Sequence, residues 1–228
     1  GETISSFHSP AISQPRIEEN PANLPTKTRH ILNISEELPL YLRQYLQEKR
    51  GIDLELAKLY LRAITYAIGE RTYTAIGFPN RAGGYELRDD KAFKGTIIAP
   101  KDISVIGGTN NNINEPLTYN LFEEFMDFLS YISMKGKEAT PLSIVLNSVG
   151  NIHKAVAYLL EHHIREVRAF FDNDEAGRKA LQHLREAGIE VKDMSCLYTP
   201  HKDFNEWLCA ESKSQNQALT PRKRGLRR

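Results

Sequence analysis

The sequence has only two cysteines, Cys196 and Cys209, and they form no CxxC motif. Two thiols cannot supply the ligands of a four-ligand zinc site, and we expect reduced thiols of a cytoplasmic protein. No stretch approaches 18 consecutive apolar residues, so the sequence predicts no membrane-spanning helix. The first residues also lack the basic and then apolar pattern of a secretory signal. We therefore expect a cytoplasmic protein without zinc in this chain.

The charged residues show no excess of one sign, since 30 Lys and Arg residues and 29 Asp and Glu residues leave a formal net charge of +1. The net charge neither indicates nor excludes a nucleic-acid partner, and only the distribution of charge can do so. The length of 228 residues and the apolar fraction of 40% are typical of one or two globular domains. A chain of this length holds a core without disulfides or metals.

The composition divides the chain into a proline-rich flexible arm or linker, a small lobe, a polar boundary, a second domain and a basic tail. In this order the segments are residues 1–30, 31–106, 107–116, 117–210 and 211–228. In the small lobe we expect two helices, with Ser35 and Asp53 as N-caps, followed by short strands. The tail, which is polar and ends in a basic run, indicates either a disordered end, a linker or a contact to phosphate groups.

Apolar segments alternate with helical patterns in the second domain. The predicted strands are residues 117–122, 143–148, 166–171 and 190–198. Strands that are separated by helices of this length imply parallel pairing with crossover helices on both faces. The predicted fold class is therefore α/β, with a mostly parallel four-stranded sheet flanked by helices and preceded by a small α+β lobe.

Carboxylates follow two of these predicted strands. Glu123 ends the first strand, and Asp172 and Asp174 follow the third. If the two strands are neighbours, the three acids meet at the carboxyl edge of the sheet, where ligands bind in such folds. Three anions so close together need cations, and hard oxygen ligands suit Mg²⁺ or Mn²⁺. The alternative is structural, because Asp174 also fits the N-cap of the following helix.

Glu123 and the segment 170–180 (FFDNDEAGRKA) together resemble the Toprim domain, which is shared by bacterial-type primases, topoisomerases and several nucleases. Its signature is a Glu after the first strand, usually followed by Gly, and a DxDxxG motif after the third. Asp172, Asp174 and Gly177 match the second motif. The resemblance implies a Toprim-type sheet in which Glu123, Asp172 and Asp174 are the catalytic, metal-binding acids.

Two further acids are implied as supporting metal ligands. Asp127 lies on the helix after Glu123, and Asp203 lies in KDFNEW, which resembles a primase motif near the metal site. The sequence is most similar to the catalytic (RNA polymerase) core of primases of plasmids and mobile elements of Bacteroides-type bacteria, over about 117–208 and more weakly over 36–106. The N-terminal zinc ribbon of that family has no counterpart in the cysteine-free arm 1–30.

One residue departs from the family pattern, because Glu124 stands where the family has glycine. A carboxylate there would crowd the metal site or add another ligand. The small lobe carries a basic patch around a Gly-Gly turn, and such a patch suits template or triphosphate phosphates. A solvated hairpin surface is the alternative. The candidate nucleic-acid or nucleotide-binding residues are Arg81, Arg88, Lys91, Lys94 and Lys101.

The resemblance implies a DNA primase core that makes short RNA primers on a single-stranded DNA template from ribonucleoside triphosphates. The 3′-hydroxyl would attack the α-phosphate of a ribonucleoside triphosphate and pyrophosphate would leave, with Glu123 as a metal ligand or the general base. A replicative helicase is the implied protein partner, and no membrane is expected. The alternatives are a Toprim-type nuclease and a non-catalytic module that binds DNA or docks a helicase. A topoisomerase is disfavoured because the chain leaves little room for a tyrosine-bearing cleavage domain.

Overall fold

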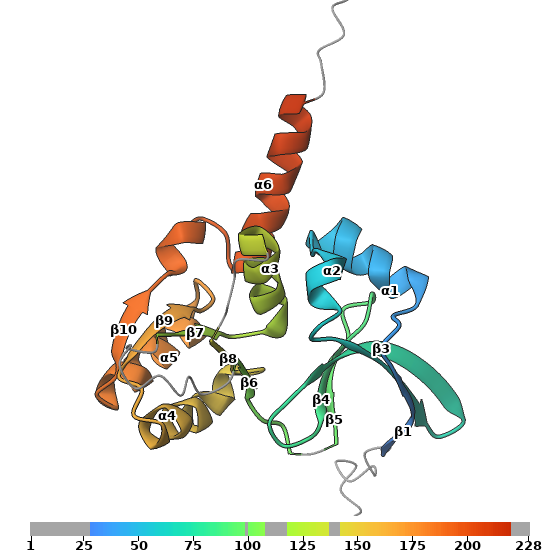
Figure 1. The fold of residues 1–228 in the computed structure, drawn as a ribbon, viewed down its shortest axis with the longest axis horizontal. Helices are drawn as coiled ribbons and strands as arrows, with labels where there is room; N and C mark the ends of the chain where they lie inside the picture. Colours follow the sequence, from blue (N-terminus) through green and yellow to red (C-terminus); the bar gives the residue numbers. More distant parts are fainter. Residues whose placement is uncertain (1–27, 99, 108–117, 137–141, 220–228) are drawn as a thin grey trace, which may run out of the picture.

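The computed structural model describes residues 28–98, 100–107, 118–136 and 142–219. Two lobes lie side by side, and each is built on a five-stranded sheet (Figure 1). The first lobe is α+β, and the second alternates strands and helices. This arrangement confirms the predicted fold class.

The sheet of the small lobe is antiparallel and follows the chain order β1-β2-β3-β4-β5. Helical segments between β1 and β2 cover one face. The strands are β1 (Arg29–Ser35), β2 (Arg62–Ile68), β3 (Arg71–Pro79), β4 (Tyr85–Arg88) and β5 (Lys94–Ile97), and the helical segments are α1 (Leu40–Gln44), the π-helical turn η1 (Tyr45–Lys49) and α2 (Leu54–Ala57).

The two expected caps have different outcomes. Asp53 caps α2, because its Oδ1 accepts hydrogen bonds from the backbone N–H groups of Glu55 and Leu56. Ser35 as a cap was wrong, since it ends strand β1 and the first helix begins only after Pro39. Proline disfavours helical backbone at the residue before it, so the helix cannot start earlier.

The second sheet has the order β10-β9-β7-β8-β6. Four of its strands pair in parallel, as predicted, and a fifth strand, β6, runs antiparallel at one edge. The strands are β6 (Ser104–Ile106), β7 (Tyr119–Phe122), β8 (Ser143–Val145), β9 (Glu166–Phe170) and β10 (Glu190–Asp193), and the helices are α3 (Phe125–Lys135), η3 (Val149–Asn151), α4 (Ile152–Glu161), α5 (Glu175–Glu186), η4 (Ser195–Tyr198) and α6 (Phe204–Leu219).

Alternation along the strands sends side chains to two separate cores. Leu121 and Ala169 face the core that includes α4 and α5, whereas Phe122 and Phe170 face the core that includes α3 and the start of α6. The period of two in a strand accounts for this division. The second of these cores continues into the small lobe, where Phe78 stacks on Phe125 with ring centroids 5.0 Å apart. The two lobes therefore share one apolar junction.

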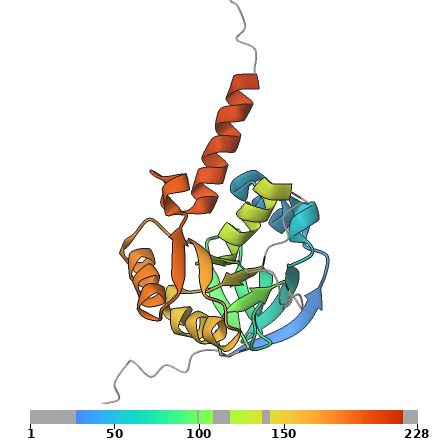
Figure 2. The same cartoon turned by 60° about the vertical axis from the view of Figure 1, so that its left-hand side comes forward.

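Three segments differ from the expected organisation. Residues 104–106, expected in the small lobe, pair with β8 as strand β6 of the second sheet. Residues 29 and 30, expected in the arm, belong to β1, and residues 211–219, expected in the tail, continue α6. This helix projects away from both lobes (Figures 1 and 2). The rest of the arm up to residue 27, the boundary segment after residue 107 and the tail from residue 220 lie outside the described residues.

None of the helices in the described ranges combines the length and the apolar character that crossing a membrane requires.

Candidate functional site

Glu123 and Asp172 stand at the carboxyl ends of neighbouring strands. Strands β7 and β9 pair directly, with Phe122 opposite Phe170, so the residues that follow them emerge at the same sheet edge. The negative charges of Asp172 and Asp174 both act on the Glu123 carboxyl group. The structure thus places the three acids that the sequence singled out at one sheet edge, where parallel sheets bind ligands.

The loop after β9 is shaped by Gly177. A Cβ atom at this position would lie 2.2 Å from the backbone oxygen of Asp172, so only glycine allows the helix to start this close to the loop. Asp174 caps α5 through Oδ1, which accepts the backbone N–H of Gly177 at 3.0 Å. Asp174 is therefore the N-cap of α5, as the structural alternative predicts. It uses one oxygen and leaves the other for a second partner.

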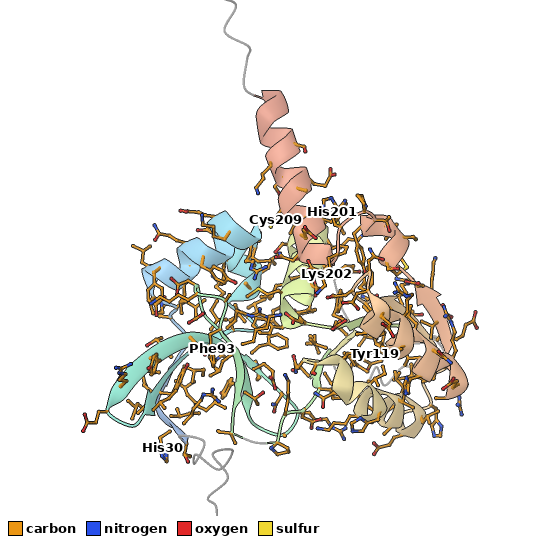
Figure 3. All side chains as sticks on the ribbon, turned by 180° about the vertical axis from the view of Figure 1, so that it is seen from behind. His30, Phe93, Tyr119, His201, Lys202 and Cys209 are labelled. Carbon is orange, nitrogen blue, oxygen red and sulfur yellow. The ribbon has the colours of Figure 1, made fainter. Side chains whose placement is uncertain are left out.

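That partner is Lys202. Its Nζ lies 2.9 Å from Oδ2 of Asp172 and 3.8 Å from Oδ2 of Asp174. Figure 3 shows Lys202 beside the N-terminal end of α6. The hydrogen bond to Asp172 and the surrounding negative charge raise the pKa of Lys202 above its usual range. Lys202 therefore forms ion pairs with both aspartates.

Asn173 holds the segment of Lys202 against this loop. Its backbone N–H donates to the Lys202 carbonyl at 2.7 Å, and its Nδ2 donates to the carbonyl of His201 at 2.8 Å. Neither Asn173 nor Lys202 is among the site residues that the sequence predicts. Lys202 lies in KDFNEW, the motif that points to Asp203, so this motif is the sequence signal for the lysine as well. No sequence pattern indicated the backbone contacts of Asn173.

Glu123 is the most perturbed of the three catalytic candidates. Its Oε2 is buried without a hydrogen-bond partner in the described part of the chain. Burial, followed by the charges of Asp172 and Asp174, raises the pKa of Glu123 to about 7. Burial also raises the pKa of Asp172, although the ion pair with Lys202 opposes this effect. A carboxyl group that titrates near neutrality is typical of functional sites.

The two supporting acids have structural partners. Asp127 is 4% exposed, and its Oδ1 accepts the backbone N–H of Asn205 at 3.1 Å. Burial and the charges of Asp203 and Asp172 raise the pKa of Asp127 well above its usual range. Oδ1 of Asp203 accepts the backbone N–H of Glu206 at 2.7 Å, which caps α6. Both acids lie near Asp172 but are already engaged in fixing the start of α6.

Three of the five basic candidates line a cavity of about 230 Å³ between the lobes. They are Arg88, Lys94 and Lys101. Arg81 lies elsewhere, with its guanidinium over the Tyr158 ring at 5.2 Å, and Lys91 lies in the exposed turn between β4 and β5. The structure therefore brings together part of the expected patch, and it does not place Arg81 or Lys91 along the cavity.

Glu124 also lines this cavity. Its carboxylate accepts hydrogen bonds from Arg88 Nη2 through Oε2 and from Lys94 Nζ, at 2.5 Å, through Oε1. These two cations lower the pKa of Glu124 in spite of its burial. The carboxylate thus joins the small lobe to the start of α3, and both of its oxygens are engaged by these cations instead of being offered as a further ligand beside Asp172 and Asp174.

The donor set at the sheet edge fits a hard divalent cation, although it is not arranged as a finished metal site. Carboxylate oxygens are the ligands that Mg²⁺ and Mn²⁺ prefer. The buried, unpartnered oxygen of Glu123 and the lysine on the two aspartates show that the edge requires positive charge. Within the described ranges, no three His, Cys, Asp or Glu side chains converge closely enough to hold one ion.

Two domain families match the sequence. The family described as Toprim-like matches residues 120–208, and a domain of unknown function (DUF8464) matches residues 31–98. The two matches lie in the second lobe and in the small lobe respectively. A search of curated proteins found no match.

Solved primase structures share the fold of this chain. The primase fragment of the bacteriophage T7 primase-helicase protein superposes with a TM-score of 0.53 and 19% identity, covering 75% of this chain and 71% of that one. A structure of the bacteriophage T7 lagging-strand DNA polymerase that interacts with primase domains of two gp4 subunits, with an RNA/DNA hybrid and dTTP, gives a TM-score of 0.53 and 20% identity. This match covers 75% of this chain and 87% of that one.

The Aquifex aeolicus primase, with its zinc-binding and RNA polymerase domains, gives a TM-score of 0.51 and 21% identity. The match covers 81% of this chain and 56% of that one, so this chain spans little more than half of that structure. Residues 120–208 therefore match a Toprim-like domain family, and the two lobes together share the fold of these primase structures.

Proposed function

We propose that this chain is a DNA primase core, which synthesises short RNA primers on single-stranded DNA by divalent-metal-dependent nucleotidyl transfer. The Toprim-like domain and the shared fold with primase fragments support this function. The observation that carries it is the juxtaposition of Glu123, Asp172 and Asp174 at the carboxyl edge of β7 and β9. The cation-lined cavity at Arg88 adds a place for phosphate groups beside the same edge.

Asp172 and Asp174 would hold Mg²⁺ or Mn²⁺ together with Glu123, and Asp127 and Asp203 would support these residues. A divalent ion in such a site orients phosphate groups and stabilises the charge that develops in an in-line displacement. Lys202 already supplies one positive charge to both aspartates. It therefore keeps them paired when no substrate is present and adds a donor for a phosphate oxygen when substrate binds.

Glu123 is suited to hold a proton at the working pH. With a pKa of about 7, its carboxylate is present in a large fraction of molecules near neutrality and still binds a proton readily. It would accept the proton of the attacking 3′-hydroxyl or act as a ligand. Arg88, Lys94 and Lys101 would bind phosphates of the incoming ribonucleoside triphosphate or of the template. Arg81 and Lys91 would bind phosphates of the template strand outside the cavity.

The proposed partners follow from this function. They are a single-stranded DNA template and ribonucleoside triphosphates, and a replicative helicase is the proposed protein partner. One of the T7 structures with the same fold comes from a primase-helicase protein. The resemblance to primases of Bacteroides-type mobile elements belongs to the same proposal.

A primer-synthesis assay tests the function. The protein is incubated with a labelled single-stranded DNA template, separately labelled ribonucleotides and Mg²⁺ or Mn²⁺, with and without an annealed primer. We expect new RNA from the wild-type protein and a loss of at least about 100-fold in Asp172→Asn/Asp174→Asn, in line with the removal of a catalytic metal site. Glu175→Gln is the matched control, because this carboxylate lies one residue from Asp174 but is exposed and paired with Lys179.

Other outcomes would separate this function from its alternatives. Shortening of the template without RNA would indicate a Toprim-type nuclease that uses the same acids. An absence of both products, together with no Mg²⁺ binding by titration, would indicate a non-catalytic module. RNA that forms only on the annealed primer would support the polymerase and locate the defect in initiation.

A further inference from the structure

The backbone conformation at Glu124 does not require glycine, although the family that the sequence resembles has glycine there. Its backbone is extended, with φ −124° and ψ 157°, which any residue adopts. The residue directly precedes α3, and its side chain reaches across to β4 and β5 of the small lobe, where it pairs with Arg88 and Lys94. The acid at this position is therefore accommodated without backbone strain, and its effect lies in its charge.

Arg88 is the fixed part of this contact. Its side chain is 5% exposed, and its guanidinium lies 5.8 Å from the centre of the Phe125 ring. Its Nε is buried without a hydrogen-bond partner in the described part of the chain. A buried guanidinium needs a counter-ion, because an unpaired buried charge is strongly destabilising. In this structure Glu124 provides that counter-ion.

The other members of the contact are more accessible. The side chain of Glu124 is 30% exposed and that of Lys94 is 58% exposed, so both can change rotamer without disturbing the core. Lys101 lines the same cavity and lies 3.7 Å from Glu86, a buried carboxylate that also accepts hydrogen bonds from Asn80 and Thr96. The cavity thus has three cations and two carboxylates, and only Glu124 is positioned to leave.

The cavity is small and open to solvent. At about 230 Å³ it is smaller than the roughly 300–1,000 Å³ of sites that enclose a whole small ligand. It fits the phosphate end of a nucleotide, with the nucleoside outside. Arg88 donates to Glu124 through Nη2, while its Nε has no partner in the described part of the chain. A phosphate group, which offers more acceptor oxygens than a carboxylate, can replace Glu124 on Nη2 and on Lys94.

We infer that Glu124 is an internal counter-ion that occupies the phosphate site of Arg88 and Lys94 until the triphosphate chain of a nucleotide displaces it. The inference deepens the proposed function and rests on it for the identity of the nucleotide. Glu124 keeps the buried arginine paired and the lobes joined in the free protein. The same carboxylate weakens triphosphate binding, because the incoming anion must first replace it.

The test measures binding of inorganic tripolyphosphate by isothermal titration calorimetry in EDTA, so that no metal at the sheet edge contributes. We expect Glu124→Gln to bind tripolyphosphate about tenfold more tightly than the wild type, since the competing charge is removed and the amide is easily displaced. Glu55→Gln is the matched control, because Glu55 is an exposed partner of Lys58 on the small lobe. It should bind with wild-type affinity.

A second variant keeps the test decisive if Glu124→Gln does not fold. Lys94→Gln changes an exposed side chain and should weaken tripolyphosphate binding at least about threefold, because one of the two cations is lost. Unchanged affinity in Lys94→Gln, or equal affinity of Glu124→Gln and the wild type, would overturn the inference. A gain for a short oligothymidylate without a gain for tripolyphosphate would overturn the assignment to the triphosphate chain.

The tripolyphosphate binding test and the primer-synthesis test can fail independently of each other. If the chain makes no RNA but Glu124→Gln gains affinity for tripolyphosphate, the counter-ion role stands and the primase function falls. If RNA is made but the affinity does not change, the function stands and the role of Glu124 falls.

Discussion

The ammonium group of Lys202 lies 2.9 Å from Asp172 Oδ2 and 3.8 Å from Asp174 Oδ2. The two acids of the DxD motif therefore share a lysine that comes from the segment before α6. The backbone contact between Asn173 and the Lys202 carbonyl fixes this segment against the loop. A protein cation thus lies where the proposed function requires a divalent ion, and the two compete for the same oxygens.

Lys202→Gln should make the protein more responsive to Mg²⁺. Without metal, the loss of the lysine leaves Asp172 and Asp174 unpaired, at a cost of about 1 kcal/mol or less because Lys202 is 61% exposed. With metal, the ion no longer competes with an ammonium group. Thermal unfolding with and without Mg²⁺ should therefore show a larger gain in Tm for Lys202→Gln than for the wild type. Lys179→Gln, at a surface pair with Glu175, is the control, and equal gains would refute the competition.

The pKa of Glu123 predicts a pH-dependent stability. Its value is about 7 in the folded chain and 4.5 as the reference for the unfolded chain, so the folded state retains a proton between these values. Its contribution to stability is complete below about pH 4.5 and is lost as the pH rises through about 7. Relative to Glu123→Gln, the wild type should lose about 1–2 kcal/mol between pH 5 and pH 8, after allowance for solvent screening.

Urea unfolding at the two pH values measures this difference. Glu175→Gln serves again as the control, because its exposed carboxylate should give the same change as the wild type. Addition of Mg²⁺ at pH 8 should restore part of the lost stability in the wild type and not in Glu123→Gln. A difference that does not depend on pH would show that Glu123 is ionised throughout this range.

Gly177→Ala should destabilise the protein and disturb the catalytic loop together. The added Cβ would lie 2.2 Å from the Asp172 oxygen, and that atom is backbone, so the loop must move. We expect a loss of about 1–3 kcal/mol, which is typical of overpacking, and weaker Mg²⁺ binding. Gly150→Ala is the matched control, because its nearest contact would be 3.8 Å away. Chemical unfolding and metal titration of both variants provide the measurement, and wild-type behaviour of Gly177→Ala would contradict the packing argument.

The elements that could be read from the sequence are those set by local pattern. The parallel strands β7 and β9 follow from apolar runs between helices, and their pairing brings Glu123 and Asp172 together. The cap by Asp53 and the close approach at Gly177 also follow from local chemistry. Strand β6 was misplaced because its partner, β8, lies almost forty residues further along the chain and its three residues carry no periodic signal.

The pairs that tune the site depend on long-range contacts, and sequence spacing does not encode these. Glu124 was expected beside the metal ligands because it is adjacent to Glu123, yet alternation of side chains along extended backbone directs it towards Arg88. Lys202 lies at the DxD loop, where Asn173 holds its segment through two hydrogen bonds to backbone carbonyls. Such partners become visible only when both lobes and the start of α6 are in place.

Asp127→Asn separates a supporting metal ligand from a buried structural acid. Burial and neighbouring negative charges raise the pKa of Asp127, so its contribution to stability is present at low pH and is lost as the pH rises through the folded pKa. An asparagine oxygen can still accept the backbone N–H of Asn205 without carrying the charge. We therefore expect Asp127→Asn to match or exceed the wild-type stability by about 1 kcal/mol, with a larger advantage at higher pH.

Asp127→Ala, which removes the acceptor as well, should be less stable than the wild type by about 1–3 kcal/mol. If Asp127 is only structural, Asp127→Asn retains Mg²⁺ binding and primer synthesis, whereas a loss of both in a fully stable variant would assign it to the metal site.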